Sequence, residues 1–252
     1  MPSVRRVLSP PVAMRAMAGV AVVAGAGPLA GCATTMQRAA RLRLNSARIL
    51  ASQSSIRVST AGTTVTVTGV TLIRSGRATA FVVTVRNVGR RAISDLPISV
   101  GYRLAHHREV YVNAGDTLTY FDAHLPGIAA GASLTWVYTA GRRLPAGARP
   151  FARVGSTPAV PGAAVDGSPV IRVRATPATG TLVDVAVRNL SGVPQYQLPV
   201  YAVAERDGHA VAAGQSSVTE LAGGASQTLQ LRLLGRTGPA AVQVEAPSTI
   251  FH

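Results

Sequence analysis

The chain has 252 residues, of which 25 are basic and ten are acidic, and its formal net charge is +15. It contains a single cysteine, which excludes an intrachain disulfide, and only 4% of its residues are aromatic. With 25 glycines and 16 prolines the composition favours many short strands and turns over long helices, and the length suffices for one large domain or two ordinary ones.

The first 31 residues have the three-part pattern of a secretory signal peptide. Arg5, Arg6 and Arg15 precede an uncharged run from Ala16 to Ala30, and small residues come directly before Cys32. The apolar run is about 15 residues long, shorter than the roughly 20 that a membrane-spanning helix needs, so a spanning helix is the weaker interpretation. The residues around Arg5 and Arg6 match the twin-arginine export pattern poorly.

The four residues that close this signal, Leu29-Ala30-Gly31-Cys32, closely resemble the lipobox of bacterial lipoproteins. The resemblance implies that diacylglycerol is joined to the Cys32 thiol and that a dedicated signal peptidase removes residues 1–31. An ordinary signal peptide that contains a cysteine fits less well, because no second cysteine exists to pair with it. We therefore expect a protein anchored in the cell membrane through lipidated Cys32 and facing the extracytoplasmic side.

The part of the mature chain that follows the predicted anchor, Cys32, is purely basic. Without the signal, 22 arginines stand against ten acidic residues, a net charge of +12, and the first acidic residue is Asp95. Because exported proteins rarely meet nucleic acid, we expect membrane lipid and an envelope protein or wall component as partners, and no nucleic acid. Residues 32–55 form a basic tether that fits a short helix and a solvated segment equally well. Its arginines are Arg38, Arg41, Arg43 and Arg48.

From residue 56 onward apolar and polar residues alternate, which is typical of β-strands. In residues 56–160, Gly69 interrupts the alternation that begins at Val65 and Val67, which predicts a β-bulge. The alternating segments are residues 65–72, 81–85, 98–104, 134–138 and 151–154, and the pattern continues between the third and the fourth through Val110, Val112, Leu118 and Tyr120. Residues 161–169 contain Pro161 and Pro169 and predict a linker. A second strand-rich part, residues 170–252, alternates at residues 170–173, 183–187, 200–203, 209–213, 229–233 and 242–244.

Segments of the first part recur in the second. The run Val83-Thr84-Val85-Arg86-Asn87 returns 102 residues later as Val185-Ala186-Val187-Arg188-Asn189, and Leu96-Pro97-Ile98 returns at the same offset as Leu198-Pro199-Val200. Gly131-Ala132-Ser133 returns only 93 residues later, so the first copy should carry about nine extra residues between Leu104 and Leu125. We expect two copies of one fold, in which the repeated asparagine ties a turn through its side chain.

Each copy would have about seven short strands in roughly 80 to 105 residues, the size of an immunoglobulin-like sandwich. The order Val187-Arg188-Asn189, then Asp207-Gly208-His209, then Leu221-Ala222-Gly223-Gly224 resembles the FxLYD-type domain of bacterial surface lipoproteins. The predicted fold is therefore all-β, with two tandem immunoglobulin-like β-sandwich domains at residues 56–160 and 170–252. This resemblance implies a fold and a surface location, and no reaction.

The best candidates for metal ligands are His106, His107 and His124, with Asp122 nearby. Neighbouring residues of a strand point to opposite faces, so His106 and His107 suit one ion only in a loop, and exposed loop histidines are the simpler interpretation. We predict no metal and no cofactor.

A catalytic site is not predicted either. No serine lies in a Gly-x-Ser-x-Gly motif, and the only thiol is the predicted lipid site. Glu205 and Asp207 are the acidic residues closest in sequence, and beside the turn at Asp207-Gly208 they are more simply hairpin residues than a catalytic pair.

Most of the aromatic residues belong to the first copy, and in an aromatic-poor chain they are expected in the core. They are Tyr102, Tyr111, Tyr120, Phe121, Trp136 and Tyr138. If the extra loop displays Tyr111 or Tyr120, it is the first place to look for a partner site. We expect a non-catalytic binding or structural module of the envelope. The alternative is a ligand-binding accessory protein of a transport or cell-wall assembly system, which a concave pocket with convergent polar groups would favour, and an enzyme ranks third.

Overall fold

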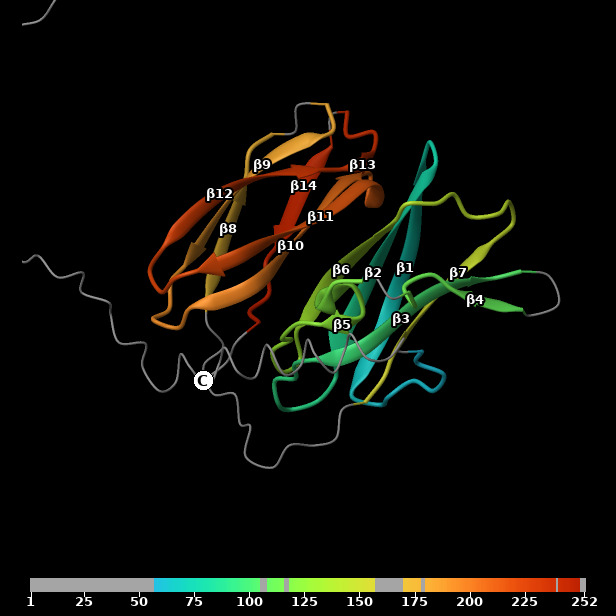
Figure 1. The fold of residues 1–252 in the computed structure, drawn as a ribbon, viewed down its shortest axis with the longest axis horizontal. Helices are drawn as coiled ribbons and strands as arrows, with labels where there is room; N and C mark the ends of the chain where they lie inside the picture. The colour runs from blue at the N-terminus through green and yellow to red at the C-terminus, as the bar shows by residue number, and fades with distance from the viewer. Residues whose placement is uncertain are drawn as a thin grey trace, which may run out of the picture. The chain divides into compact units, whose positions relative to one another are not determined.

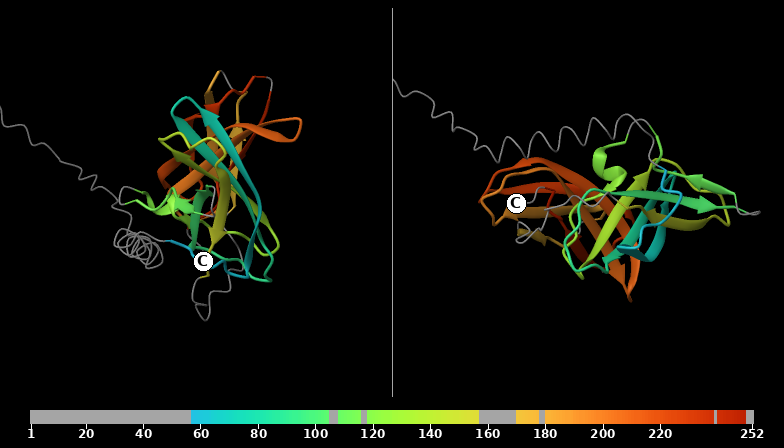
Figure 2. Two further views of the ribbon diagram at one scale, coloured as in Figure 1. Left: turned by 90° about the vertical axis from the view of Figure 1, so that its right-hand side faces the viewer. Right: turned by 90° about the horizontal axis from the view of Figure 1, so that it is seen from below.

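A computed structural model describes residues 57–104, 108–115, 118–156, 170–177, 180–238 and 240–249 (Figure 1). The signal peptide, Cys32, the tether and the linker at residues 161–169 lie outside these ranges, and the expectations for them stay predictions. Within the described ranges no helix is long and apolar enough to cross a membrane. The described part of the chain is all-β, as predicted, with strands joined by loops and one short 3₁₀ helix (Figure 2). We call residues 57–156 the first half and residues 170–249 the second half.

The first half contains two antiparallel sheets. One has the order β1-β2-β6 and is built from β1 (Val65–Ser75), β2 (Ala78–Asn87) and β6 (Ser133–Ala140). In the other, β3 (Leu96–Arg103) pairs with three strands. These are β4 (Glu109–Tyr111), β5 (His124–Leu125) and β7 (Arg149–Val154).

The second half also contains two antiparallel sheets. The first has the order β12-β9-β8 and consists of β8 (Ile171–Ala175), β9 (Leu182–Asn189) and β12 (Ser226–Arg232). The other has the order β13-β11-β10-β14. Its strands are β10 (Gln195–Arg206), β11 (His209–Leu221), β13 (Leu234–Gly235) and β14 (Ala241–Glu245).

Two local predictions are confirmed. The register between β1 and β2 shifts between Val67 and Gly69, which is the predicted bulge. Asp207 and Gly208, with φ of 51° and 73°, join β10 to β11 in a two-residue turn between the paired residues Arg206 and His209. Two positive φ angles in such a turn are the signature of a type I′ hairpin, so Asp207 is a hairpin residue.

The repeated asparagines make the same hydrogen bonds in both halves. Asn87 is fully buried, and its Nδ2 donates to the carbonyls of Arg91, Ile128 and Ala129 at 2.7, 3.2 and 3.1 Å. Asn189 is also fully buried, and its Nδ2 donates to the carbonyls of Val193, Leu221 and Ala222 at 2.7, 3.3 and 3.3 Å. The offsets between corresponding partners are the 102 and 93 residues found in the sequence. Each Oδ1 also accepts a backbone N–H two residues later, from Gly89 and from Ser191, which closes the predicted Asx turn.

The extra residues of the first half interrupt one strand. In the second half, β11 runs without a break from the pairing Val203↔Ala213 to the pairing Pro199↔Ser217. In the first half the corresponding pairings are Gly101↔Tyr111 on β4 and Pro97↔His124 on β5. Twelve residues, 112–123, therefore stand where the second half has three, which accounts for the nine extra residues. We call residues 112–123 the insertion.

The insertion corrects one expectation. The alternating pattern predicted a strand at Leu118 and Tyr120, whereas the structure has a 3₁₀ helix, η2 (Tyr120–Asp122). The Asp122 carboxylate accepts hydrogen bonds from both the backbone N–H and the hydroxyl of Thr119, at 2.9 and 2.8 Å. These contacts satisfy the start of a helical turn as a capping residue does, and they end the extended conformation.

The two halves share a core. Each half has its own cluster of buried apolar residues, around Trp136 in the first and around Val185 and Leu231 in the second. Tyr201, Val203 and Ala213 of β10 and β11, however, belong to the cluster of the first half. The sheet β13-β11-β10-β14 thus packs against the sheet β1-β2-β6, and β10 is buried on both faces.

Candidate functional site

The insertion is held to the first half by two buried side chains. Asn113, which is 1% exposed, accepts the backbone N–H of Val100 at 2.8 Å and donates to the carbonyls of Ile98 and Asp122 at 2.9 and 2.8 Å. The indole N–H of the fully buried Trp136 donates to the carbonyl of Phe121 at 3.0 Å. These bonds satisfy backbone groups that the interrupted strand leaves unpaired, and they fix the described residues of the insertion, 112–115 and 118–123.

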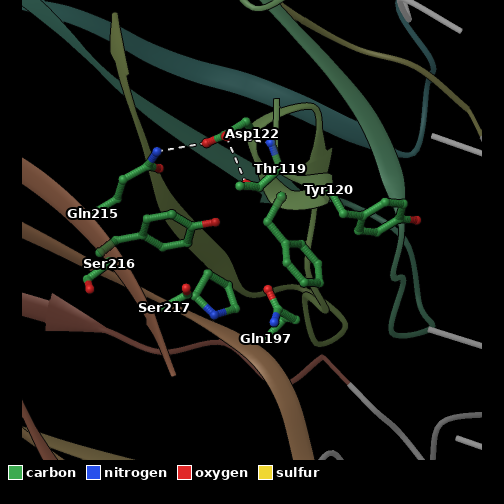
Figure 3. A pocket seen from close by; sticks show the side chains of 10 residues that line it. Thr119, Tyr120, Asp122, Gln197, Gln215, Ser216 and Ser217 are labelled. Atoms are coloured by element: carbon green, nitrogen blue, oxygen red, sulfur yellow. Dashed lines mark hydrogen bonds between the residues drawn. The ribbon is translucent and has the colours of Figure 1, made fainter. Parts of the chain in front are cut away.

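The insertion and the second half enclose a half-open pocket of about 240 Å³, which we call the insertion pocket. Residues 119–122 form one wall, and the other consists of Gln197, Pro199, Tyr201 and residues 215–217. In Figure 3 Asp122 and Thr119 face Gln215, with Ser216, Ser217 and Gln197 along the opposite side and Tyr120 turned away from Gln215. Gln215 Nε2 donates to Asp122 Oδ1 at 2.7 Å, and this hydrogen bond links the insertion to the second half at the pocket.

Three side chains cross the sheet of the second half in one row beside this pocket. Tyr201 pairs with Gln215 on one side and with Glu245 on the other. Gln215 bonds to Asp122, and Glu245 Oε2 accepts the backbone N–H of Thr135 at 3.1 Å. The hydroxyl of Tyr201, which is 2% exposed, has no hydrogen-bond partner among the described residues. An unpaired buried hydroxyl costs about 1 to 3 kcal/mol.

Burial raises the pKa of three groups at this boundary. The pKa of Tyr201 lies well above its ordinary value, first because of burial and then because of the charges of Asp122 and Glu245. The pKa of Glu245 is raised by burial, against the opposing effect of the hydrogen bond from Thr135. Burial also raises the pKa of Tyr120, and Asp95 adds to this through its charge and a hydrogen bond. Tyr201 is therefore neutral at ordinary pH.

Because the pKa of Glu245 is higher in the folded chain than in the unfolded one, ionising this residue destabilises the fold. Its favourable contribution is complete below the ordinary value of 4.5 and is lost as the pH rises through the raised pKa. Glu245→Gln should therefore unfold at a higher denaturant concentration than wild type at pH 7, and this advantage should shrink as the pH falls through the raised pKa and be lost below 4.5. Denaturant titrations at pH 7 and pH 4 measure the difference.

Glu109 is the matched control, because its shift has the opposite sign. The pKa of Glu109 is lowered to about 2, chiefly by the hydrogen bond from Arg153 and also by the hydrogen bond from Arg103 and the charges of both arginines, against the desolvation that raises it. Glu109→Gln should therefore be less stable than wild type at pH 7, with the difference disappearing as the pH falls from 4.5 toward 2. Equal pH dependence of the two variants would contradict the assigned shifts.

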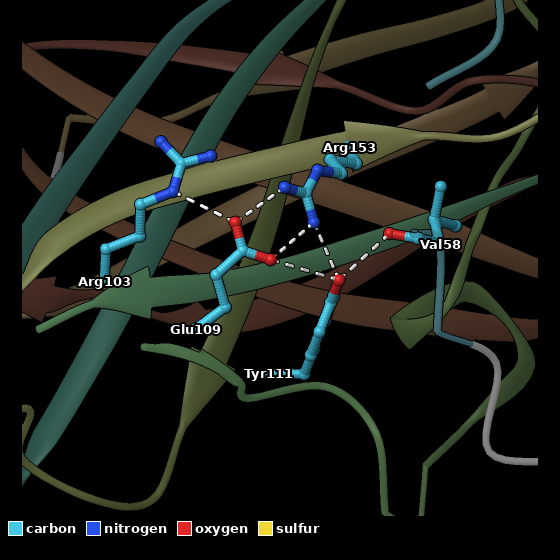
Figure 4. A network of polar contacts seen from close by, with 5 residues as sticks. All are labelled: Val58, Arg103, Glu109, Tyr111 and Arg153. Atoms are coloured by element: carbon cyan, nitrogen blue, oxygen red, sulfur yellow. Dashed lines mark hydrogen bonds and ion pairs between the residues drawn. The ribbon is translucent and has the colours of Figure 1, made fainter. Parts of the chain in front are cut away.

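Glu109 lies in a polar network that fixes the beginning of the described chain (Figure 4). Both nitrogens of the Arg153 fork donate to its carboxylate, at 2.6 and 2.7 Å, and Arg103 Nε donates at 3.0 Å. Arg153 also donates to the hydroxyl of Tyr111 at 2.7 Å, and that hydroxyl donates to the carbonyl of Val58 at 3.3 Å. The network thus holds Val58 against the sheet, so Tyr111 has a structural role here.

The structure places the metal and aromatic candidates as follows. His124 is 7% exposed, stacks on Tyr120 with ring centroids 4.1 Å apart, and its Nδ1 lies 3.1 Å from the carbonyl of Tyr120. Burial lowers the pKa of His124, although that hydrogen bond opposes the shift. His106 and His107 lie outside the described residues, and among the residues that are described no group of three His, Cys, Asp or Glu side chains could hold a metal ion. The structure therefore places His124 against the ring of Tyr120.

The aromatic residues divide between core and insertion. Tyr102, Phe121, Trp136 and Tyr138 are buried, as expected. Tyr111 and Tyr120 are half-buried, the first in the network around Glu109 and the second in the insertion. Glu205 accepts a hydrogen bond from Gln243 at 2.8 Å beside the Asp207 hairpin, in keeping with its interpretation as a hairpin residue. Cys32, the predicted lipid site, lies outside the described residues.

Sequence reasoning missed Gln197, Tyr201 and Gln215. One signal was present: Gln197 occupies the position of Asp95 in the repeat, and both residues have positive φ angles, 51° and 59°. Positive φ is uncommon for residues other than glycine and points to a position that the surroundings enforce. Asp95 forms a hydrogen bond with Tyr120 from this position, and Gln197 lines the insertion pocket.

No match was found when the sequence was compared with protein-family models and with curated proteins.

Proposed function

We propose that this chain is a lipoprotein of the cell envelope, anchored through Cys32 on the extracytoplasmic side of the membrane, and that it acts without catalysis as a binding module. The observation that carries the anchor is the run Leu29-Ala30-Gly31-Cys32 at the end of an export signal, with Cys32 as the only cysteine. Two immunoglobulin-like copies resembling the FxLYD-type domain are part of this proposal, supported by the matching hydrogen bonds of Asn87 and Asn189.

The insertion pocket supports a binding role over a purely structural one. Its polar groups come from both halves and converge on a concave surface, which is the usual form of a ligand site. A spacer would not need the unpaired hydroxyl of Tyr201 beside that surface. The same observation favours the second candidate function, a ligand-binding accessory protein of a transport or cell-wall assembly system.

Affinity capture from envelopes tests the binding role. The tagged full chain is cross-linked in intact cells and purified from the membrane, and the control carries residues 1–55 fused to an unrelated domain. We expect an envelope protein or wall component to be recovered with the full chain and not with the control. Identical recoveries would mean that the described β-structure contributes no binding.

A further inference from the structure

The insertion pocket has the chemistry of a site for an uncharged, hydroxyl-rich ligand. Its polar lining consists of hydroxyl groups, the amides of Gln197 and Gln215, and the carboxylate of Asp122. No lysine, arginine or histidine is among these lining residues, so the lining offers no positive charge to bind an anionic ligand. The Asp122 carboxylate already accepts three hydrogen bonds, from Thr119 twice and from Gln215, so its charge is largely compensated.

The apolar part of the lining suits one side of a ring. Phe121 and Pro199 contribute carbon surfaces on the two walls of the pocket. A sugar ring presents a carbon-rich face to such surfaces and an edge of hydroxyl groups that both donate and accept hydrogen bonds. Side-chain hydroxyls, amides and a carboxylate are suitable partners for that edge.

The hydroxyl of Tyr201, in the wall of the pocket, is a buried polar group without a hydrogen-bond partner among the described residues. Tyr201 stands in one row between Gln215 and Glu245. Phenylalanine would fill the same space without the cost of an unpaired hydroxyl. A ligand, or a water that it orders, would supply the missing partner after a small movement of the ring.

We propose that the insertion pocket binds a single neutral sugar ring, with Asp122, Gln215 and Tyr201 as its hydrogen-bonding groups. The volume of about 240 Å³ lies below the range of roughly 300 to 1,000 Å³ typical of drug-sized ligands, which limits the occupant to about one ring. Because the pocket is half-open, that ring can belong to a longer glycan. This inference rests on the proposed binding role and adds the class of ligand.

The test uses the full lipidated protein in a zwitterionic detergent, because detergents with sugar headgroups would compete. The probes are the methyl glycosides of glucose, mannose, galactose and N-acetylglucosamine, and the uncharged peptide probe is N-acetylalanine methylamide. Binding is followed by calorimetry and by the shift in melting temperature. We expect at least one glycoside to bind and the peptide probe not to bind.

Tyr201→Phe and Ser217→Ala should weaken glycoside binding, the first at least tenfold, because a site built to bond a hydroxyl discriminates strongly when a partner is lost. Tyr138→Phe is the matched control, since the Tyr138 hydroxyl meets the carbonyl of Val112 outside the pocket, and its affinity should equal that of wild type. Binding of the peptide probe instead, binding of no probe, or unchanged affinity in Tyr201→Phe would each overturn the proposal. Those results leave the envelope capture and the membrane attachment unaffected, so failure of the sugar site is distinct from failure of the proposed function.

Discussion

Replacing Asn87 or Asn189 with alanine is expected to destabilise the fold by about 3 to 4 kcal/mol in each case. Each side chain is fully buried: the two hydrogens of its Nδ2 are shared among three backbone carbonyls, and its Oδ1 accepts one backbone N–H, so it makes three to four hydrogen bonds. A net loss of about 1 kcal/mol per bond gives this sum, since the backbone groups stay buried when their partner is removed. For a chain of this size the melting temperature should fall by roughly 10 °C.

The control is Arg91→Ala, because Asn87 bonds only to the backbone carbonyl of this exposed residue. Its effect should stay within about 0.5 kcal/mol. The two asparagine variants should cost similar amounts, since their bonds correspond one to one. A large loss in Asn87→Ala beside a negligible one in Asn189→Ala would contradict the equivalence of the two halves.

Replacing Cys32 with serine is expected to abolish membrane attachment by lipid altogether. One acyl chain gives marginal, reversible binding, whereas diacylglycerol supplies two chains, which suffice for stable attachment. Cys32→Ser should take up no fatty-acid label, and its signal should stay uncleaved or be cut elsewhere. Cell fractionation and labelling with a fatty-acid analogue measure both effects.

The control for this variant changes the tether and keeps the anchor. Arg38, Arg41, Arg43 and Arg48 could each add about 1 kcal/mol near an anionic surface, a contribution that salt screens within about a Debye length. Replacing all four with glutamine should leave the protein in the membrane fraction even at high salt. If that change alone releases the protein, charge holds it at the membrane and lipid does not.

Local features of the fold were predictable where short-range geometry decides them. Gly69 as a bulge and Asp207-Gly208 as a hairpin follow from the conformations that these residues prefer. The strand alternation identified most strands for the same reason. It failed at Leu118 and Tyr120, where two alternating residues are too few and the hydrogen bonds from Thr119 to Asp122 favour a helical turn. The Thr-x-x-Asp spacing was the available signal.

The packing of the two halves against each other could not be predicted from the sequence, because an apolar strand does not indicate which other strands cover it. Residues 198–204 of β10 are nearly all apolar, which predicts burial on both faces without saying by what. Tyr201 and Val203 in fact join the core of the first half. Likewise Gln215 resembles any polar residue of an alternating strand, and only the insertion brings Asp122 to 2.7 Å from it. Contacts between residues so distant in sequence leave no local pattern.

The anchor is the central claim, and the mass and N-terminus of the protein extracted from its own membrane test it most directly. We predict a mature chain that begins at Cys32, without residues 1–31, and that carries diacylglycerol on the Cys32 sulfur. Recovery of that chain from the membrane with a free Cys32 thiol, or with an N-terminus at another residue, would contradict the account.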